Sequence, residues 1–154
     1  MRRFLSYWWW KLGLVALGLL LLAQLVPYRV DNPPVTAEPA WDSPQTRELA
    51  VRACYDCHSN ETDVLWFEHV APVSWYITNH VREGRAAVNF SEWDTAPGDE
   101  ADESGEVVLE GEMPPGSYTR FGLHGDAELT AEERRALAEG LDRTIAADPP
   151  GRGG

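Results

Sequence analysis

Hydrophobic side chains are concentrated near the amino terminus of this 154-residue chain and are spread thinly over the rest of it. Residues 4–26 form an apolar stretch that only Ser6, Lys11 and Gln24 interrupt. A helix needs about 20 predominantly apolar residues to cross the hydrocarbon core of a bilayer. The pattern therefore predicts one transmembrane helix within an uncleaved membrane anchor, residues 1–27.

The basic residues at the two ends of this stretch predict its orientation. Arg2, Arg3 and Lys11 lie on its amino-terminal side, whereas Arg29 alone follows it. Because basic flanks stay in the cytoplasm, we expect a single-pass protein of the cytoplasmic membrane with its C-terminal domain in the periplasm or another extracytoplasmic space. A cleaved signal peptide is the alternative, although no A-x-A-like cleavage site follows Leu22.

The next apolar pattern is helical and leads into a pair of cysteines. Ser43 is suited to be the N-cap of a helix with Pro44 in its first turn. The apolar positions of this helix form a narrow stripe that ends beside Cys54, and they are Leu49, Ala50 and Ala53. Before it, the proline-rich residues 28–42 predict an extended spacer.

Two longer helices are predicted from apolar residues at helical spacing. One runs from about Pro72 to Glu83 and ends at Gly84, and its inward face is Val73, Tyr76, Ile77, His80 and Val81. The other has Thr130 as N-cap and Glu133 completing a capping box, and its apolar positions are Leu137, Leu141 and Ile145.

The region between these two helices is polar and acidic. Residues 91–105 predict a solvated acidic loop, and a short helix is expected over residues 106–110. No alternating β-branched run is present, so we expect an all-α domain over residues 43–147, followed by a disordered tail, residues 148–154. A domain of this size buries only a modest core.

Net charge narrows the range of partners. Residues 30–154 contain 9 basic and 25 acidic residues, a formal charge of −16. Such a surface repels phosphate groups, so we expect no nucleic-acid binding and favour a partner protein with a basic docking face. Strong charge of one sign also serves solubility alone.

Candidate chemistry is concentrated in Cys54-Tyr55-Asp56-Cys57-His58, which has the C-x-x-C-H pattern of c-type haem attachment. Two thiols at this spacing can reach the two vinyl groups on one edge of a porphyrin, and the adjacent imidazole can reach the iron. We therefore expect one covalently bound haem c, with His58 as the proximal ligand. Attachment of this kind takes place outside the cytoplasm, in agreement with the predicted export.

Two other uses of the cysteines remain open. A thioredoxin-like dithiol also has the C-x-x-C spacing, but it requires a strand–helix context that this chain lacks. A zinc site could combine Cys54 and Cys57 with two histidines, although the spacing fits no common zinc finger.

The second axial ligand of the iron must come from a short set of candidates. Met113 is favoured because Pro114 and Pro115 stiffen the segment that follows it and have no N–H group to satisfy against an apolar haem face. His80 is the runner-up because its helical face is apolar. His69 and His124 have polar neighbours and are interpreted as surface residues. A sixth position open to small ligands completes the alternatives.

Several stretches together resemble a family of short, membrane-anchored haem-binding domain proteins related to cytochrome c. The matching stretches are Cys54–Thr62, Ala71–Trp75, His80–Arg85, Asn89–Trp93, Gly111–Pro115 and the Ser117-Tyr118-Thr119 that follows. The resemblance implies a cytochrome c-like helical fold around one haem c in a bacterial cell envelope, with Met113 as the natural distal ligand. The chain departs from it at Asp94–Glu106, where a more helical segment would be expected.

These patterns predict a non-enzymatic electron carrier at the outer face of the cytoplasmic membrane. It would transfer single electrons to redox partner proteins through a haem iron ligated by His58 and Met113. The alternative is a haem-based sensor or small-ligand binder with an open or exchangeable sixth position. A peroxidase would require a distal acid–base histidine, for which His80 is the sole candidate.

Overall fold

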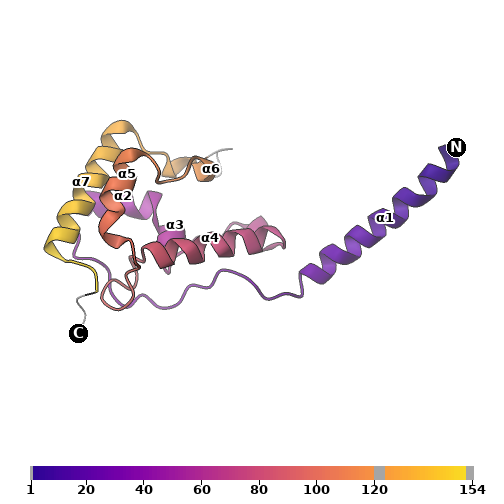
Figure 1. Cartoon of the computed structure of the whole chain (residues 1–154), viewed down its shortest axis with the longest axis horizontal. Helices are drawn as coiled ribbons and strands as arrows, with labels where there is room; N and C mark the ends of the chain where they lie inside the picture. Colours follow the sequence, from indigo (N-terminus) through magenta and orange to yellow (C-terminus); the bar gives the residue numbers. More distant parts are fainter. Residues whose placement is uncertain (1, 120–123, 152–154) are drawn as a thin grey trace. The chain divides into compact units, whose positions relative to one another are not determined.

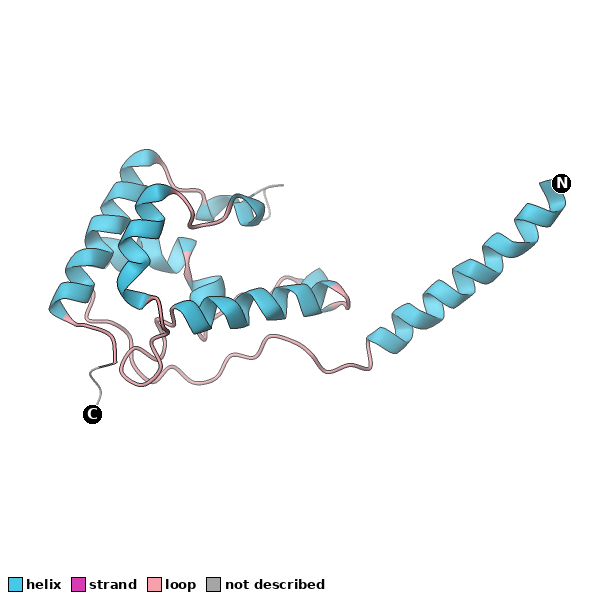
Figure 2. Cartoon of the chain, viewed as in Figure 1, coloured by secondary structure: helices cyan, strands magenta, loops and turns pink. Residues whose placement is uncertain are grey.

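The regular secondary structure of this protein is helical. The computed structural model describes residues 2–119 and 124–151, and it describes the side chains of all of these except residues 2–7 and 117. Within these ranges every regular element is a helix and none is a strand, as Figure 1 and Figure 2 show. The predicted all-α class is therefore confirmed.

The helices fall into two compact units. Unit 1 comprises Met1–Val30 and Val64–Asn79, and unit 2 comprises Asp31–Asp63 and His80–Gly154. The elements in chain order are α1 (Arg2–Ala23), α2 (Pro44–Ala53), α3 (Tyr55–His58), η1 (Trp66–His69), α4 (Val73–Ala87), η2 (Ala101–Glu103), α5 (Ser104–Glu110), α6 (Gly116–Thr119), η4 (Gly125–Ala127) and α7 (Ala131–Ala147).

In unit 1, α1 exposes its large apolar side chains. Among the most exposed are Trp9, Val15, Leu19, Leu21 and Leu22. Within the part of the chain that is described, no helix combines the length and the apolarity needed to cross a membrane. The side chains of Arg2 and Arg3, on which the predicted orientation partly depends, lie outside the described residues.

The core of unit 2 forms where α2, α5 and α7 pack together. The N-cap of α2 is confirmed, because the Ser43 hydroxyl accepts a hydrogen bond from the Thr46 N–H at 3.2 Å. The predicted stripe of α2 is buried in this core, and Ala50 has no exposed surface. Because α2 ends at Ala53 with Cys54 as its C-cap, its last turn brings the cysteine pair to the edge of the core.

The C-terminal helix also follows its predicted pattern. Thr130 and Glu133 form the capping box, in which each side chain accepts a hydrogen bond from the other residue's backbone N–H. Leu137 and Leu141 are fully buried. The helix ends at Ala147, two residues before Pro149.

The predicted end of α4 is wrong, because the helix continues through Gly84 to Ala87. Gly84 serves a different purpose. A Cβ atom at this position would lie 2.5 Å from the backbone oxygen of Cys57. We call residues Cys54–His58 the cysteine turn. The glycine is therefore required for the close approach of α4 to the cysteine turn and does not terminate the helix.

The inward face predicted for α4 is confirmed at Val81 but is wrong at Tyr76 and His80. Its most buried positions are Ser74, Thr78 and Val81, whereas Tyr76 and His80 are exposed. Hydroxyl groups make this burial possible, since the Thr78 hydroxyl donates to the Ser74 carbonyl oxygen at 2.6 Å. The prediction counted apolar residues only and so missed a buried face built from Ser and Thr.

The acidic region after α4 is less solvated than its composition indicates. Phe90, Ser91 and Trp93 are almost completely buried, and η2 and α5 follow directly. The short helix expected here is present as α5 and begins two residues earlier than predicted. Aromatic residues within the acidic segment supply the apolar surface that holds it against unit 2.

The segment expected to be an extended spacer is free of helix, and its second half packs in unit 2. The Thr36 N–H donates to the Ser91 carbonyl oxygen at 2.9 Å, and Ala37 forms an isolated bridge with Glu92.

The tail expected from residue 148 onward begins with ordered contacts, because the Trp93 indole donates to the Asp148 carbonyl oxygen at 2.9 Å. Tail residues 152–154 lie outside the described residues.

Candidate functional site

A cavity of about 460 Å³ lies within unit 2, between the cysteine turn and the segment that contains Met113. Its apolar lining comes from four parts of the chain and includes Ala53, Val88, Phe90, Val107, Val108 and Leu141. Five carboxylic residues also border it, and they are Asp56, Glu83, Glu100, Glu103 and Glu112. The volume is within the range of about 300–1,000 Å³ that is typical of cofactor sites.

The two cysteines line this cavity from consecutive helical turns. Cys54 is the C-cap of α2, and its N–H donates to the Ala50 carbonyl oxygen at 2.8 Å. Cys57 lies within the single turn of α3. Burial, reinforced by the neighbouring Cys57 sulfur, raises the pKa of the Cys54 thiol to about 12. Cys54 is therefore a neutral thiol at physiological pH, unlike the low-pKa thiolate of a thioredoxin-type dithiol.

His58 follows Cys57 directly and also lines the cavity. Its Nδ1 atom lies 3.2 Å from the Val88 carbonyl oxygen. A carbonyl oxygen can only accept, so Nδ1 donates the proton and the lone pair of a neutral imidazole is on Nε2. Burial lowers the pKa of His58, and the hydrogen bond to Val88 opposes this to a smaller extent. Burial favours the neutral imidazole and the hydrogen bond orients it, so the ring can ligate a metal through Nε2.

A buried polar network holds the chain immediately after His58. The Phe90 N–H donates to the His58 carbonyl oxygen at 2.9 Å, and the Asn60 N–H donates to the Ser91 hydroxyl at 2.9 Å. The Asn89 side-chain amide donates to the Asn60 side-chain oxygen at 3.2 Å. Asn60, Asn89 and Ser91 are each at least 96 % buried. The network therefore fixes the backbone of residues 58–60 against residues 89–91.

Arg85 connects the same turn to the segment that precedes α2. Its guanidinium donates to the Ser59 carbonyl oxygen at 2.7 Å, to the Thr62 hydroxyl at 3.2 Å and to the Asn32 side-chain oxygen at 3.0 Å. Sequence reasoning noticed the stretches that contain Arg85 and Asn89 but assigned them no role. The short polar residues Ser59-Asn60 directly after His58, and Asn89 and Ser91 on either side of Phe90, were the signal that could have revealed this network.

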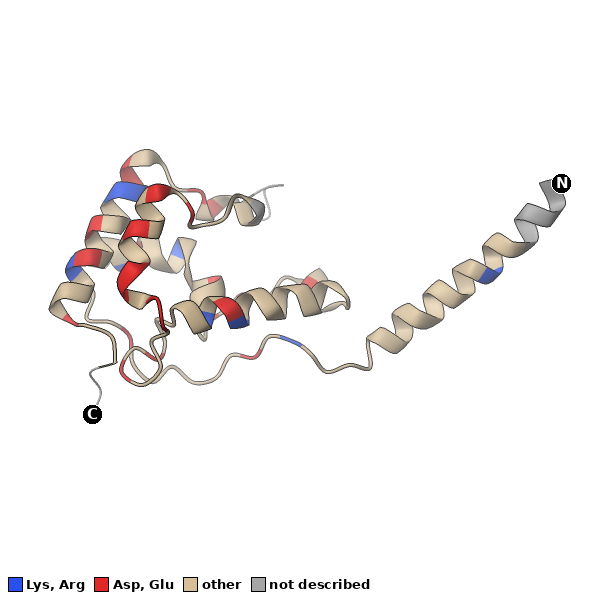
Figure 3. Ribbon diagram, viewed as in Figure 1, with Lys and Arg blue, Asp and Glu red and all other residues tan. Residues whose placement is uncertain are grey.

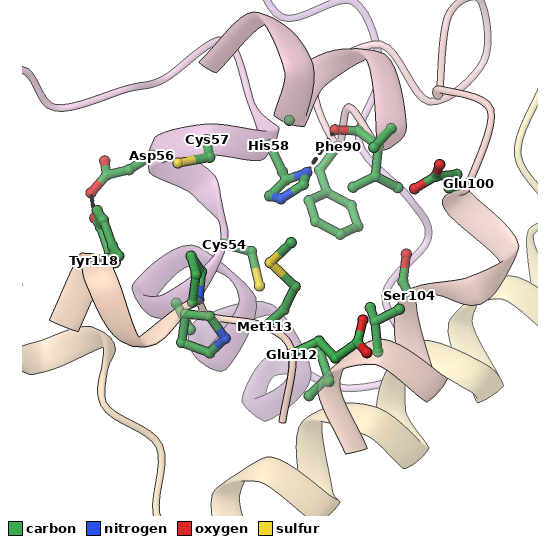
Figure 4. Close-up of a pocket in the computed structure, with 18 of the residues that line it drawn as sticks. Cys54, Asp56, Cys57, His58, Phe90, Glu100, Ser104, Glu112, Met113 and Tyr118 are labelled. Carbon is green, nitrogen blue, oxygen red and sulfur yellow. Dashed lines mark hydrogen bonds between the residues drawn. The ribbon is translucent and has the colours of Figure 1, made fainter. Parts of the chain in front are cut away.

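Met113 lies on the opposite wall of the cavity. Gly111 ends α5 in the left-handed conformation, with φ 85°, and so turns the chain towards the cavity. The Arg134 guanidinium then donates to the Met113 carbonyl oxygen at 2.7 Å and to the Val108 carbonyl oxygen at 2.9 Å. Figure 4 shows the Met113 thioether directed into the cavity, facing His58 and Cys54. The two predicted axial ligands therefore line one cavity.

A second contact joins residues 111–118, which we call the methionine segment, to the cysteine turn. The Tyr118 hydroxyl donates a hydrogen bond to the Asp56 carboxylate (Figure 4), and the other oxygen of this carboxylate accepts from the Asp63 N–H at 3.0 Å. The Tyr118 ring stacks on the His124 ring with 4.1 Å between the centroids. Burial first, and then the hydrogen bond to Asp56, raise the pKa of Tyr118, so the phenol remains protonated and available as a donor.

The remaining histidines occupy different environments. His80 borders the cavity from α4 but is exposed, so the predicted inward orientation is wrong. His69 is exposed, as expected. His124 is not the surface residue expected, because only 15 % of its side chain is exposed and the Tyr118 ring covers it. Its polar sequence neighbours concealed this packing.

The two other interpretations of the cysteines find no support in the part of the chain that is described. No group of three or more His, Cys, Asp or Glu side chains converges there as a metal site, whereas structural zinc requires four ligands. No strand precedes the cysteine turn in these residues, as a thioredoxin-like fold would require.

The cavity fits a c-type haem in its donor set. One wall supplies two sulfurs for thioether bonds and an oriented imidazole from Cys54, Cys57 and His58. The other supplies a thioether sulfur from Met113, and the surfaces between them are largely apolar. Soft sulfur and imidazole ligands in apolar surroundings are the ligand types that bind haem iron.

Comparison with known proteins agrees with this fit. The family model described as haem-binding domain matches residues 18–143, so the chain belongs to this family. The match confirms the predicted haem-binding family. Searches among curated proteins and among solved structures gave no match.

Proposed function

We propose that this member of the haem-binding domain family binds one haem c through thioether bonds to Cys54 and Cys57 and transfers single electrons. His58 and Met113 would be the axial ligands. The observation that carries the proposal is the meeting of an oriented imidazole, two thiols and a thioether in one largely apolar cavity. When bound, the haem iron would supply a reversible one-electron couple.

The residues of the cavity support this role by orienting the ligands and excluding water. The Val88 carbonyl fixes the His58 ring, and the Arg134 guanidinium fixes the backbone that bears Met113. Phe90 is 98 % buried beside them. A closed His/Met pair in an apolar cavity favours a raised reduction potential.

We further propose that the protein is a carrier and not an enzyme. Peroxidase chemistry would use a distal histidine as acid and base, paired with a second polar group. Among the described residues, the only histidine that borders the cavity besides His58 is His80, and it is exposed on α4. Met113 lies where such a group would be needed, on the wall opposite His58.

Membrane anchoring through residues 4–26 is part of the proposal. From Trp8 to Ala23 the sequence contains Lys11 as its single charged residue, and the apolar side chains of α1 are exposed. Basic residues at positions 2, 3 and 11 favour a cytoplasmic amino terminus and an extracytoplasmic unit 2. Such a location would also supply the compartment in which haem c is attached.

The proposed electron-transfer partner is a protein with a basic docking face. In the ribbon of Figure 3, α5 contains acidic residues and no basic ones, whereas α7 contains four acidic and three basic residues. Glu83, Glu100, Glu103 and Glu112 continue this negative charge to the border of the cavity. Opposite charge accelerates encounter and orients the two proteins.

The mass of the purified, denatured protein tests the covalent attachment directly. Full-length protein produced with haem-maturation machinery should carry the mass of one haem and stain for haem on a denaturing gel of the membrane fraction. Cys54→Ser combined with Cys57→Ser should abolish both signals. Unmodified wild-type mass would refute haem attachment, whereas haem staining confined to the soluble fraction would refute the anchor alone.

A sensor or small-ligand binder is the second candidate, and one observation favours it. Among the described residues, one side-chain hydrogen bond joins the methionine segment to the cysteine turn, from Tyr118 to Asp56, and loss of this bond would open the sixth position. Rapid, stoichiometric binding of carbon monoxide by the reduced protein would support this candidate. Slow or absent binding would support the closed carrier.

A further inference from the structure

A second apolar surface lies in unit 1, outside α1. Residues 64–79 contain one acidic residue, Glu68, and no Lys or Arg, in a chain whose residues 30–154 carry a formal charge of −16. Glu68 is 92 % buried, and its carboxylate accepts a hydrogen bond from the Leu65 N–H at 2.9 Å. The solvent-facing surface of this segment therefore has no exposed carboxylate, lysine or arginine side chain.

Large apolar side chains occupy that surface. Trp66 is 80 % exposed and Tyr76 is 58 % exposed, while Val70 and Val73 are each 40 % exposed. The Trp66 ring is held edge-on against Phe67, with 5.8 Å between the ring centroids. We call Trp66, Val70, Val73 and Tyr76 the Trp66 surface. An exposed tryptophan and tyrosine beside valines is the composition that proteins place at the boundary between lipid and water.

The Trp66 surface is tied to the carboxyl end of α1 within the same unit. The Gln24 side-chain amide donates to the Ala71 carbonyl oxygen at 3.1 Å and accepts from the Ala71 N–H at 3.0 Å. The Tyr28 hydroxyl donates to the Asn79 side-chain oxygen at 2.5 Å. These contacts hold residues 64–79 at two points, Ala71 and Asn79. Their partners, Gln24 and Tyr28, follow the end of α1 at Ala23.

We propose that the Trp66 surface binds the headgroup region of the phospholipid bilayer, as a second membrane contact beside α1. The inference rests on the proposed insertion of α1. If α1 enters the bilayer, the pairing of Gln24 with Ala71 brings residues 66–76 to the level where the apolar core gives way to headgroups. Transfer of uncharged aromatic and aliphatic side chains from water to this level lowers their free energy. The acidic surface of unit 2, in contrast, is repelled by anionic lipid.

Nitroxide labels on the full-length, haem-loaded protein in phosphatidylcholine vesicles test this contact. Trp66→Cys places the label on the surface, and Val51→Cys, at a 41 % exposed position of α2 in unit 2, is the matched control. Val70→Cys repeats the measurement at a second surface position. The protein without an added cysteine, treated in the same way, reports any labelling of Cys54 and Cys57.

Collision rates with oxygen and with a water-soluble nickel chelate give the result. Labels at positions 66 and 70 should collide several-fold more with oxygen than with the nickel chelate, and the label at position 51 should show the reverse. Nickel collisions at position 66 equal to those at position 51 would overturn the inference. Low collision rates with both reagents would mean burial against a second copy of the chain and would also overturn it.

Flotation of the vesicles separates this inference from the proposal on which it rests. Protein that does not float with the vesicles refutes the insertion of α1 and the Trp66 surface together. Protein that floats, but whose label at position 66 is accessible to nickel, refutes only the Trp66 surface. Covalent haem, measured by mass in the same samples, is independent of both results.

Discussion

The two walls of the cavity are built in different ways. The cysteine wall, Cys54–His58, is followed by a buried network in which Asn60, Asn89 and Ser91 exchange hydrogen bonds. The methionine wall, residues 111–118, is held by the Arg134 guanidinium and by the Tyr118 hydroxyl. Buried, mutually satisfied polar groups resist local opening better than contacts near the surface. The proximal side should therefore be rigid and the distal side easier to displace.

The largest effect is expected where α4 presses against the cysteine wall. Gly84→Ala would place a methyl group 2.5 Å from the Cys57 backbone oxygen, so backbone must shift. We expect a loss of about 1–3 kcal/mol in the free energy of unfolding, as for other overpacked sites, together with a lower yield of covalent haem.

Urea unfolding and the mass of the denatured protein measure these two effects. Gly125→Ala is the control, because a methyl group there would meet no atom within 4 Å. Equal stability and haem yield for the two variants would show that the contact between Gly84 and Cys57 does not matter.

Met113→Ala should affect the methionine wall alone. Covalent haem should remain, while the weak long-wavelength absorption of thioether-ligated ferric haem should disappear. Met113 is half-buried, so the cost in stability should be about 1–2 kcal/mol, below that of a fully buried methionine. Met113→Leu keeps most of the packing but removes the thioether. It therefore separates the loss of the ligand from the loss of side-chain volume. Unchanged absorption in both variants would exclude Met113 as the ligand.

Tyr118→Phe should loosen the methionine wall without removing the ligand. It deletes the hydrogen bond to Asp56, which should cost about 1 kcal/mol, and it should speed the binding of carbon monoxide to the reduced protein. Asp56→Asn keeps an acceptor for the hydroxyl and should have a smaller effect. Carbon monoxide rates identical to wild type in both variants would mean that this contact does not control access.

The smallest effect is expected in acid, at the helix that supports the methionine wall. Hydrogen bonds with Thr130 and Arg52 lower the pKa of Glu133 from 4.5 to about 2, which means that folding favours the carboxylate. Its contribution is complete above pH 4.5 and is lost as the pH falls towards about 2. Urea midpoints across this window should fall less steeply in Glu133→Gln than in wild type. Glu132→Gln, which lacks these partners, should follow wild type.

Much of unit 2 could be predicted because its signals are local. The caps at Ser43 and Thr130 depend on side chains within three residues of the helix start, and the stripes of α2 and α7 depend only on helical periodicity. The pairing of the cysteines with His58 is likewise contained in five consecutive residues. Such features survive in almost any tertiary arrangement.

Other features required the tertiary structure. Gly84 has the sequence appearance of a helix end, and only the proximity of Cys57 explains why a glycine continues the helix. His124 has polar neighbours in sequence, and only the stacked ring of Tyr118 buries it. Each depends on a partner more than five residues away, which periodicity and composition do not record.

The sequence by itself determined which groups can meet an iron porphyrin, because thiols, imidazole and thioether are fixed by residue identity and short spacing. The tertiary structure decided which of them share a cavity and how firmly each is held. It placed Met113 opposite His58, left His80 exposed and joined Asn60 to Asn89 across 29 positions of the chain. The physical reason is that local chemistry follows from neighbours in sequence, whereas orientation and burial follow from packing between distant segments.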